Sequence, residues 1–261
     1  MITILINNKF TKEKDANVSL LSNISRGYGL FETLRTYKDR KLFKEKDHLK
    51  RMMDSAKLID LKVKYSTSEI LKMLQKVIAK SPHKIQRIKI MALEKKLVII
   101  SSPLKVNKKI YDGVKCKSIK CTRDLPEIKS ISYLASFLSH EKAIKEGYFD
   151  AILIDKDNEV YEGAYSNIFW FEGKYLCTRS DKILPGITRK IILEISPFKI
   201  KFKKIKLSQL KKKSGIFLTT SISGIVPVAA IDYTKLKRQE PGTYTKILIQ
   251  KYQECIKKHC S

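Results

Sequence analysis

The spacing of apolar residues changes repeatedly along this chain, and this change limits the folds that it can adopt. Short β-rich runs at residues 2–6, 30–37 and 85–93 are typical of strands. Other stretches carry apolar residues three and four positions apart, as on one helical face. The first of these contains Leu49, Met52, Met53 and Ala56. Strands and helices are interleaved without a regular βαβ rhythm, so the pattern predicts an α+β fold.

Several helix ends can also be placed from the sequence. Ser66-x-x-Glu69 is a capping box that predicts the start of a second helix. In the second half, a helix is predicted from about residue 131 to 146, ended by Gly147. Pro185-Gly186 predicts another helix start, and a closing helix is expected from about Thr243. Residues 121–126 are polar and contain proline, which is typical of a linker between domains.

Composition excludes some classes of protein. Lys and Arg number 54 against 26 Asp and Glu, for a net charge of +28. Clustered positive charge would favour nucleic-acid binding, but these lysines are spread along the whole chain, so we expect a solvated Lys-rich surface and no nucleic-acid partner. The five cysteines show neither C-x-x-C pairs nor zinc spacing, so no metal is expected.

No stretch of apolar residues approaches the length of a membrane span, and the apolar run at the first residues is too short for a signal peptide. The expected location is a reducing cytoplasm.

No Walker loop, dinucleotide fingerprint or nucleophile elbow is present. The four histidines lie on lysine-rich or helical stretches and are expected at the surface. Six polar segments remain as candidate functional sites, and each lies where a predicted strand is followed by a helix or a loop. In chain order they are residues 25–35, 48–57, 127–130, 162–169, 183–189 and 219–228.

Taken together and in this order, the six segments resemble the class IV, or fold type IV, pyridoxal-phosphate enzymes. That family includes branched-chain and D-amino-acid aminotransferases and 4-amino-4-deoxychorismate lyase. The resemblance runs from about Gly27 to Val228. It implies a small N-terminal α/β sandwich (1–120), a linker (121–126) and a larger cofactor-binding domain with a β-barrel-like core (127–261). It also implies a homodimer, in which residues of one subunit complete the site of the other.

The resemblance implies that pyridoxal 5′-phosphate is held as a Schiff base on Lys129, which precedes a helix. A buried lysine near other positive charge suits this role, because only a neutral amine attacks an aldehyde. Glu162 matches the carboxylate that keeps the pyridine nitrogen protonated. Asn167 matches a side chain at the phenolic oxygen of the cofactor, and Tyr133 is a further candidate for that contact.

The cofactor phosphate requires backbone N–H donors, hydroxyl groups and a cation. Ile187 and Thr188 match the donors at a helix start, and Ser221 with Thr220 beside it matches a second donor turn. By the same resemblance, Arg51 is the cation for the phosphate. Leu184 matches the apolar residue that rests on one face of the cofactor ring.

The substrate contacts are less well marked in the sequence. The strand at residues 87–93 shows neither the Tyr-x-Arg nor the Arg-x-His pair with which relatives bind the substrate carboxylate. Arg26 is our candidate for that cation, with Arg87 or Lys89 as others. Phe31 and Tyr165 are further candidates for contact with the substrate, and Tyr165 would narrow the pocket.

Three functions remain open from the sequence. The first is an aminotransferase that interconverts amino acids and 2-oxo acids. The second is the lyase that releases pyruvate from aminodeoxychorismate to form 4-aminobenzoate. The third is a basic binding protein without a cofactor.

Overall fold

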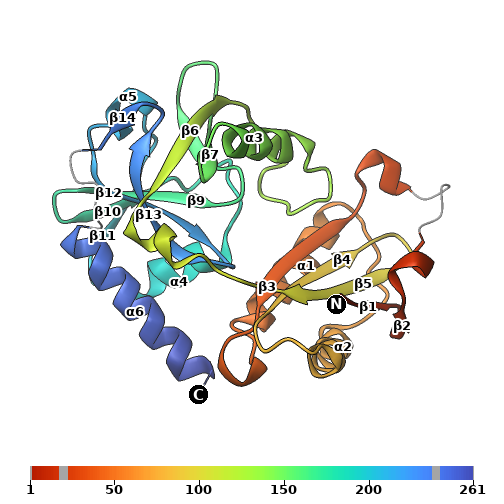
Figure 1. The fold of residues 1–261 in the computed structure, drawn as a ribbon. Helices are drawn as coiled ribbons and strands as arrows, with labels where there is room; N and C mark the ends of the chain where they lie inside the picture. Colours follow the sequence, from red (N-terminus) through yellow and green to blue (C-terminus); the bar gives the residue numbers. More distant parts are fainter. Residues whose placement is uncertain (1, 18–22, 237–241, 261) are drawn as a thin grey trace. The chain divides into compact units, whose positions relative to one another are not determined.

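A computed structural model describes residues 2–17, 23–236 and 242–260 and divides into two compact units (Figure 1). The first unit comprises Met1–Lys105, Ile128–Tyr133 and Ile256–Ser261, and the second comprises Val106–Glu127 and Leu134–Cys255. Helices and strands are mixed in both units, as the α+β prediction requires.

The first unit is built on an antiparallel sheet of five strands in the order β2-β1-β5-β4-β3. Side chains alternate between the two faces of each strand. In β4, for example, Ile88 and Ile90 are buried, whereas Arg87 and Lys89 are exposed. The strands are β1 (Thr3–Ile6), β2 (Lys9–Thr11), β3 (Leu30–Arg35), β4 (Gln86–Ala92) and β5 (Leu97–Pro103).

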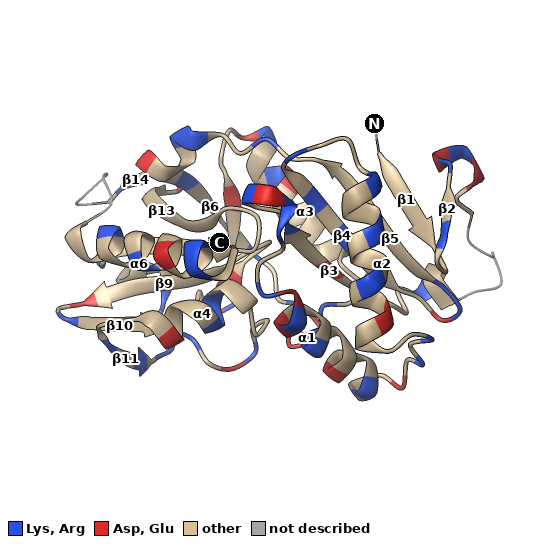
Figure 2. Cartoon of the chain, turned by 90° about the horizontal axis from the view of Figure 1, so that it is seen from below, with Lys and Arg blue, Asp and Glu red and all other residues tan. Residues whose placement is uncertain are grey.

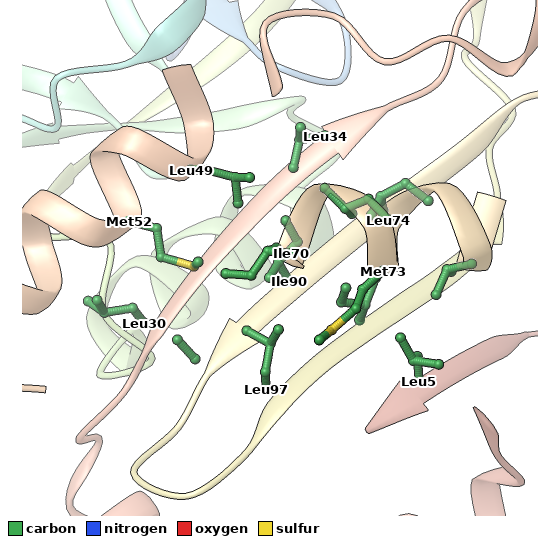
Figure 3. Close-up of a cluster of buried hydrophobic side chains, with 14 of the residues drawn as sticks. Leu5, Leu30, Leu34, Leu49, Met52, Ile70, Met73, Leu74, Ile90 and Leu97 are labelled. Carbon is green, nitrogen blue, oxygen red and sulfur yellow. The ribbon is translucent and has the colours of Figure 1, made fainter. Parts of the chain in front are cut away.

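Helices α1 (Glu45–Leu58) and α2 (Thr67–Lys80) cover one face of this sheet. The apolar stripe of α2 packs onto the inward side chains of the strands, and Leu74 and Ile90 are fully buried there (Figure 3). Buried side chains from both helices and from four strands share this one cluster. The predicted helical periodicity therefore corresponds to a real core.

The two helices begin in different ways. At α2 the predicted capping box is present, because the Ser66 hydroxyl accepts from the Glu69 N–H and the Glu69 carboxylate accepts from the Ser66 N–H. At α1 the N-cap residue Lys44 has a left-handed backbone and no side-chain cap. Instead, the Lys44 N–H donates to Nε2 of His259, 3.4 Å away, from the far end of the chain. The start of α1 thus relies on a residue distant in sequence.

The second unit is built on a mixed sheet of nine strands that forms a half-barrel, in agreement with the expected barrel-like core. Its path runs β11-β10-β9-β12-β13-β6-β7-β8, with β14 paired to β13. The strands are β6 (Val114–Lys120), β7 (Asp150–Ile154), β8 (Val160–Gly163), β9 (Asn167–Glu172), β10 (Tyr175–Thr178), β11 (Lys199–Phe202), β12 (Ser214–Thr220), β13 (Gly224–Ile231) and β14 (Thr234–Lys235).

Four α-helices accompany this sheet: α3 (Leu134–Lys145), α4 (Ile187–Ile195), α5 (Leu207–Leu210) and α6 (Thr243–Cys260). Short 3₁₀ helices occur at Glu13–Asp15, Asn23–Arg26, Lys38–Arg40 and Lys108–Asp112. The last residues of α6 belong to the first unit, whereas its start belongs to the second.

Two expected boundaries differ from the observed ones. The helix predicted from residue 131 begins at Leu134, because residues 129–131 form main-chain hydrogen bonds with the start of β3. The compact units also follow other bounds than the predicted domains. β6 pairs with β13 and β7 and so joins the second unit, whereas residues 128–133 join the first.

Lysine and arginine are distributed over helices, strands and loops of both units (Figure 2). Within the described residues, no helix combines the length and apolar character needed to cross a membrane.

We expect Leu74→Ala to lower the free energy of unfolding of the first unit by about 2–5 kcal/mol, because it leaves a cavity in a filled core. Leu58→Ala is the control, because this leucine at the end of α1 is 70% exposed, and its loss should change stability by less than about 0.5 kcal/mol. Urea unfolding followed by circular dichroism measures both. Fluorescence is unsuitable, since the single tryptophan, Trp170, lies in the second unit. Equal losses in the two variants would contradict this packing.

Candidate active site

Lys129 is held in an extended segment beside β3. Its carbonyl oxygen accepts from the Phe31 N–H at 2.9 Å, and the Ile131 N–H donates to the Gly29 carbonyl at 2.9 Å. The Lys129 ammonium group lies 4.4 Å from the centre of the Phe31 ring and 5.6 Å from that of Tyr133. These two rings meet edge to face at 5.2 Å. The predicted cofactor lysine is half-buried, and its nitrogen lies beside two aromatic rings.

A second ammonium group shares the Phe31 ring. The Lys89 nitrogen lies 5.4 Å from the ring centre. Lys89 pairs with Thr33 and Arg87 pairs with Arg35 in the β3–β4 register, so these side chains share the sheet face of Phe31. The candidates Arg87 and Lys89 are thus on the sheet face that also carries the Lys129 ammonium.

Arg26 is placed differently. It ends the 3₁₀ helix Asn23–Arg26, is exposed, and donates from Nη1 to the Asn23 side-chain oxygen at 2.9 Å.

On the opposite face of β3, Glu32 is fully buried among apolar residues of the core. Arg51 donates to it twice, from Nε to Oε1 at 2.8 Å and from Nη2 to Oε2 at 2.7 Å. His48 Nδ1 lies 2.7 Å from the same Oε2. The expectation that every histidine lies at the surface was wrong for His48, whose side chain is only 3% exposed. The predicted phosphate cation therefore belongs to a buried network of three residues.

The charges in this network follow from its surroundings. Burial raises the pKa of Glu32, but the Arg51 and His48 partners outweigh burial and bring it to about 2. Burial lowers the pKa of His48, and the charges of Arg51 and Lys129 act in the same direction against the attraction of Glu32. At neutral pH we therefore assign an ionised Glu32, a charged Arg51 and a neutral His48.

The second unit holds Glu162, the predicted partner of the pyridine nitrogen. Its side chain is buried, and its Oε1 accepts from Arg123 Nη1 at 2.7 Å. Its Oε2 accepts from Asn167 Nδ2 at 3.1 Å and from the Leu184 N–H at 3.0 Å. An arginine and two further donors favour the ionised form of this carboxylate. Three of the predicted cofactor residues, Glu162, Asn167 and Leu184, therefore meet in one network.

Helix α4 begins directly beside this network. Asn167 also donates to the Leu184 carbonyl at 2.9 Å, and a Cβ at Gly186 would collide with the Asn167 side-chain oxygen. Gly186 is therefore required for this close approach. It is the N-cap of α4 and provides no side-chain cap, which leaves the first N–H groups, at Ile187 and Thr188, as donors at a helix N-terminus.

The second predicted donor turn connects β12 to β13. Thr220 Oγ1 accepts from the Ser223 N–H at 2.8 Å and so closes the turn that contains Ser221. Thr219, one residue earlier, pairs directly with Asn167 of β9, so the two side chains lie on the same sheet face.

Four buried side-chain polar atoms of the second unit have no hydrogen-bond partner within the described residues, at Ser136, Arg189, Thr219 and Thr245. Two of them, Thr219 Oγ1 and Arg189 Nε, belong to residues close to the predicted cofactor residues. Buried polar atoms are nearly always satisfied in proteins, so each requires an explanation. Thr219 belongs to the Asn167 face, and the Arg189 pKa is lowered by burial and raised by Glu162. A hydroxyl and a guanidinium near donors of this kind fit an anionic, hydrogen-bonding cofactor.

The second unit also contains a cavity of about 330 Å³. Its walls are formed by Cys121, Thr122, Arg123, Pro126, Leu153, Tyr161, Glu162 and Lys182. Among these lining residues Glu162 is the one predicted to bind the cofactor, so the cavity adjoins the Glu162 network and does not by itself outline the predicted site.

Tyr165 stacks on His140, with ring centres 4.1 Å apart. Asp150 accepts from the Ser166 hydroxyl at 2.8 Å and lies 3.1 Å from His140 Nδ1. Asp150 thereby fixes the turn between Glu162 and Asn167. The part that Tyr165 was expected to play, narrowing the substrate pocket, remains a prediction.

Sequence reasoning missed Glu32, His48 and Arg123. Glu32 had a readable signal, because it occupies an inward position between Leu30 and Leu34, where an unpaired carboxylate would be costly. Arg123 had no such signal in the sequence, since it lies in the segment that was interpreted as a linker.

Comparison with known proteins identifies the chain more closely. The family model described as amino-transferase class IV matches residues 29–231. The D-alanine aminotransferase of Staphylococcus epidermidis is 29% identical, with 99% of each protein covered. The crystal structure of a branched-chain aminotransferase from Thermoproteus uzoniensis with norvaline is 25% identical with a TM-score of 0.89, over 98% of this chain and 95% of that one.

A branched-chain amino acid aminotransferase from T.th., solved with pyridoxamine 5′-phosphate, shares the fold at 21% identity and a TM-score of 0.89. The match covers 98% of this chain and 94% of that chain. The family match takes in every predicted cofactor residue from Arg51 to Ser221. This chain therefore belongs to the class IV aminotransferase family.

Proposed function

We propose that this enzyme transfers an amino group between an amino acid and a 2-oxo acid, with pyridoxal phosphate attached through Lys129. Family membership supports the transfer reaction, and the relative solved with pyridoxamine phosphate supports the cofactor. The observation that carries the cofactor assignment is Glu162, a buried carboxylate with an arginine and two N–H donors around it. Such a group can hold a proton on a pyridine nitrogen without losing its own charge.

When bound, pyridoxal phosphate supplies a ring that draws electrons away from the substrate α-carbon. We assign the remaining tasks to this chain. The Lys129 amine anchors the cofactor and then moves the proton that leaves the α-carbon. Asn167 orients the ring, with Tyr133 as a further candidate, and Leu184 supports one ring face.

The residue matches assign several groups of this chain to the phosphate. Arg51 provides the cation. The N–H groups of Ile187 and Thr188 and the turn that contains Thr220 and Ser221 provide hydrogen-bond donors.

The relatives are aminotransferases by name, and nothing in the site favours the aminodeoxychorismate lyase alternative. The named relatives act on D-alanine or on branched-chain amino acids, so we propose amino acids with aliphatic side chains as substrates. A reducing compartment such as the cytoplasm is also proposed, because no disulfide joins the cysteines within the described residues.

We propose a homodimer with helix α3 at its interface. The buried side of α3 consists of small residues, Ser136, Ser139 and Ala143. Its exposed side carries large apolar residues, Leu134, Phe137, Leu138 and Ile144. A helix with its apolar side outward is typical of an interaction surface, and a second copy of this chain is the partner that the family resemblance implies.

Lys129→Ala should abolish the visible absorption that the enzyme gains from pyridoxal phosphate, because this lysine is the amine assigned to the Schiff base with the cofactor. Lys50→Ala, which removes an exposed lysine of α1, should leave that absorption intact. In the native enzyme an amino acid should bleach the band and a 2-oxo acid should restore it. Borohydride reduction followed by peptide mass spectrometry should locate the cofactor on Lys129. A label on any other lysine would overturn the assignment.

The substrate carboxylate can be assigned by comparing Lys89→Ala, Arg87→Ala and Arg26→Ala. We expect Lys89→Ala to raise KM for amino acids by about tenfold to a hundredfold with little change in kcat, since a lost charge-assisted hydrogen bond costs about 1.5–3 kcal/mol. Its ammonium shares the Phe31 ring with Lys129, whereas Arg26 is exposed and bound to Asn23. Amines that lack a carboxylate serve as controls and should show no KM change. A carboxylate-specific effect in Arg26→Ala alone would assign the role to Arg26 instead.

Leu138→Glu should convert the dimer to a monomer, because a charge in the centre of an apolar interface is costly. Leu58→Glu introduces the same charge at a leucine of the first unit that is also exposed and should leave the dimer intact. Size-exclusion chromatography with light scattering measures the mass of each. A dimeric Leu138→Glu variant would remove α3 from the interface.

A further inference from the structure

Glu32 and His48 have no role in the chemistry described above, yet they are among the most deeply buried polar residues of the first unit. Leu30, Glu32 and Leu34 point inward from β3 towards helix α1. His48 and Arg51 are three residues apart on α1, so they project from the same helical face towards Glu32. A carboxylate in this apolar row would be strongly unfavourable without partners.

The geometry fixes the orientation of the Arg51 guanidinium. Its Nε and Nη2 atoms each donate to a different oxygen of Glu32, at 2.8 and 2.7 Å, which places the two planar groups side by side. A carboxylate can rotate about its own bond, and such rotation would carry the guanidinium with it. His48 opposes this rotation, because its Nδ1 is hydrogen-bonded to Oε2 at 2.7 Å.

The protonation state of His48 follows from its partner. An ionised carboxylate only accepts hydrogen bonds, so Nδ1 of His48 must carry the hydrogen. The neutral ring therefore donates to Glu32 without adding a second positive charge beside Arg51. Glu32 offsets the positive charge of Arg51. The network therefore fixes the orientation of the guanidinium group but lowers the net positive charge around it.

We propose that Glu32 and His48 are positioning residues that set Arg51 in the orientation required to bind the phosphate of the cofactor. This inference rests on the proposed function, in which Arg51 is the phosphate cation. The competing explanation is that the three residues only fasten α1 to β3. The two explanations differ in one measurable property, which is selectivity for a phosphorylated ligand.

The test compares the affinity of the apoenzyme for pyridoxal phosphate with its affinity for pyridoxal, which lacks the phosphate. We expect His48→Leu to weaken pyridoxal phosphate binding about tenfold and to leave pyridoxal binding unchanged, because the Arg51 guanidinium loses its fixed orientation. A tenfold loss corresponds to about 1.4 kcal/mol. His48→Asn should keep the native affinities, since its amide nitrogen can occupy the place of Nδ1.

Two further variants complete the experiment. Glu32→Gln, which removes the charge and one acceptor, should show the same phosphate-specific loss, and it serves if His48→Leu does not fold. Arg51→Lys provides the reference value for the largest expected loss of selectivity for pyridoxal phosphate over pyridoxal. Adding His48→Leu to Arg51→Lys should then cause little further change, because residues that act through one another are not additive. Circular dichroism and urea unfolding verify that each variant is folded.

The possible outcomes distinguish failure of the proposed function from failure of the positioning role of Glu32 and His48. If the native apoenzyme binds neither ligand, the proposed function fails and this inference fails with it. If the native apoenzyme prefers pyridoxal phosphate and the folded His48→Leu and Glu32→Gln variants keep that preference, the positioning role alone is overturned. Equal weakening of both ligands would likewise show a purely structural role.

Discussion

The main-chain pairing between residues 129–131 and the start of β3 is the constraint on which the predicted chemistry depends. It holds Lys129 in an extended segment against Phe31, although β3 and Lys129 are about a hundred residues apart in the chain. Two glycines make this contact possible. A Cβ at Gly27, which has a positive φ of 75°, would lie 2.7 Å from Ser132, and a Cβ at Gly29 would press on Ile131 and Ala92. Gly27 and Gly29, in the segment of residues 25–35, thus allow the close approach of the segment that contains Lys129.

The two units solve the same electrostatic problem in similar ways. Each buries one glutamate that an arginine neutralises, Glu32 with Arg51 and Glu162 with Arg123. Each glutamate also accepts one or more uncharged donors, which fix the direction of its oxygens. Buried ion pairs contribute little to stability by themselves, because desolvation offsets their attraction. Their retention in a site is better explained by the orientation that they impose on charged groups.

Much of the fold could be predicted because it depends on local patterns. The capping box at Ser66, the alternation in β4 and the Gly-terminated helix before residue 150 are all readable from neighbouring residues. The start of α3 could not be read, because the backbone of residues 129–131 is occupied by a partner distant in sequence. The same limit applies to the site. The order of the motifs predicted candidate residues for cofactor binding. The side chains that bind Arg51 and Glu162 could not be predicted, because they come from segments that are distant in sequence and contact each other only in the folded chain.

The route of the chain has a consequence for the order in which the molecule can assemble during synthesis. The first unit draws on three separate stretches, and the last of them lies at the end of α6. His259 accepts a hydrogen bond from the N–H of Lys44, the N-cap residue of α1, the helix that carries Arg51. Because a chain is synthesised from its N-terminus, the sheet and helices of residues 1–105 emerge before His259 has been made. The His259 contact at the start of α1 therefore forms only after residue 259 has been made, later than the sheet and helices of the same unit.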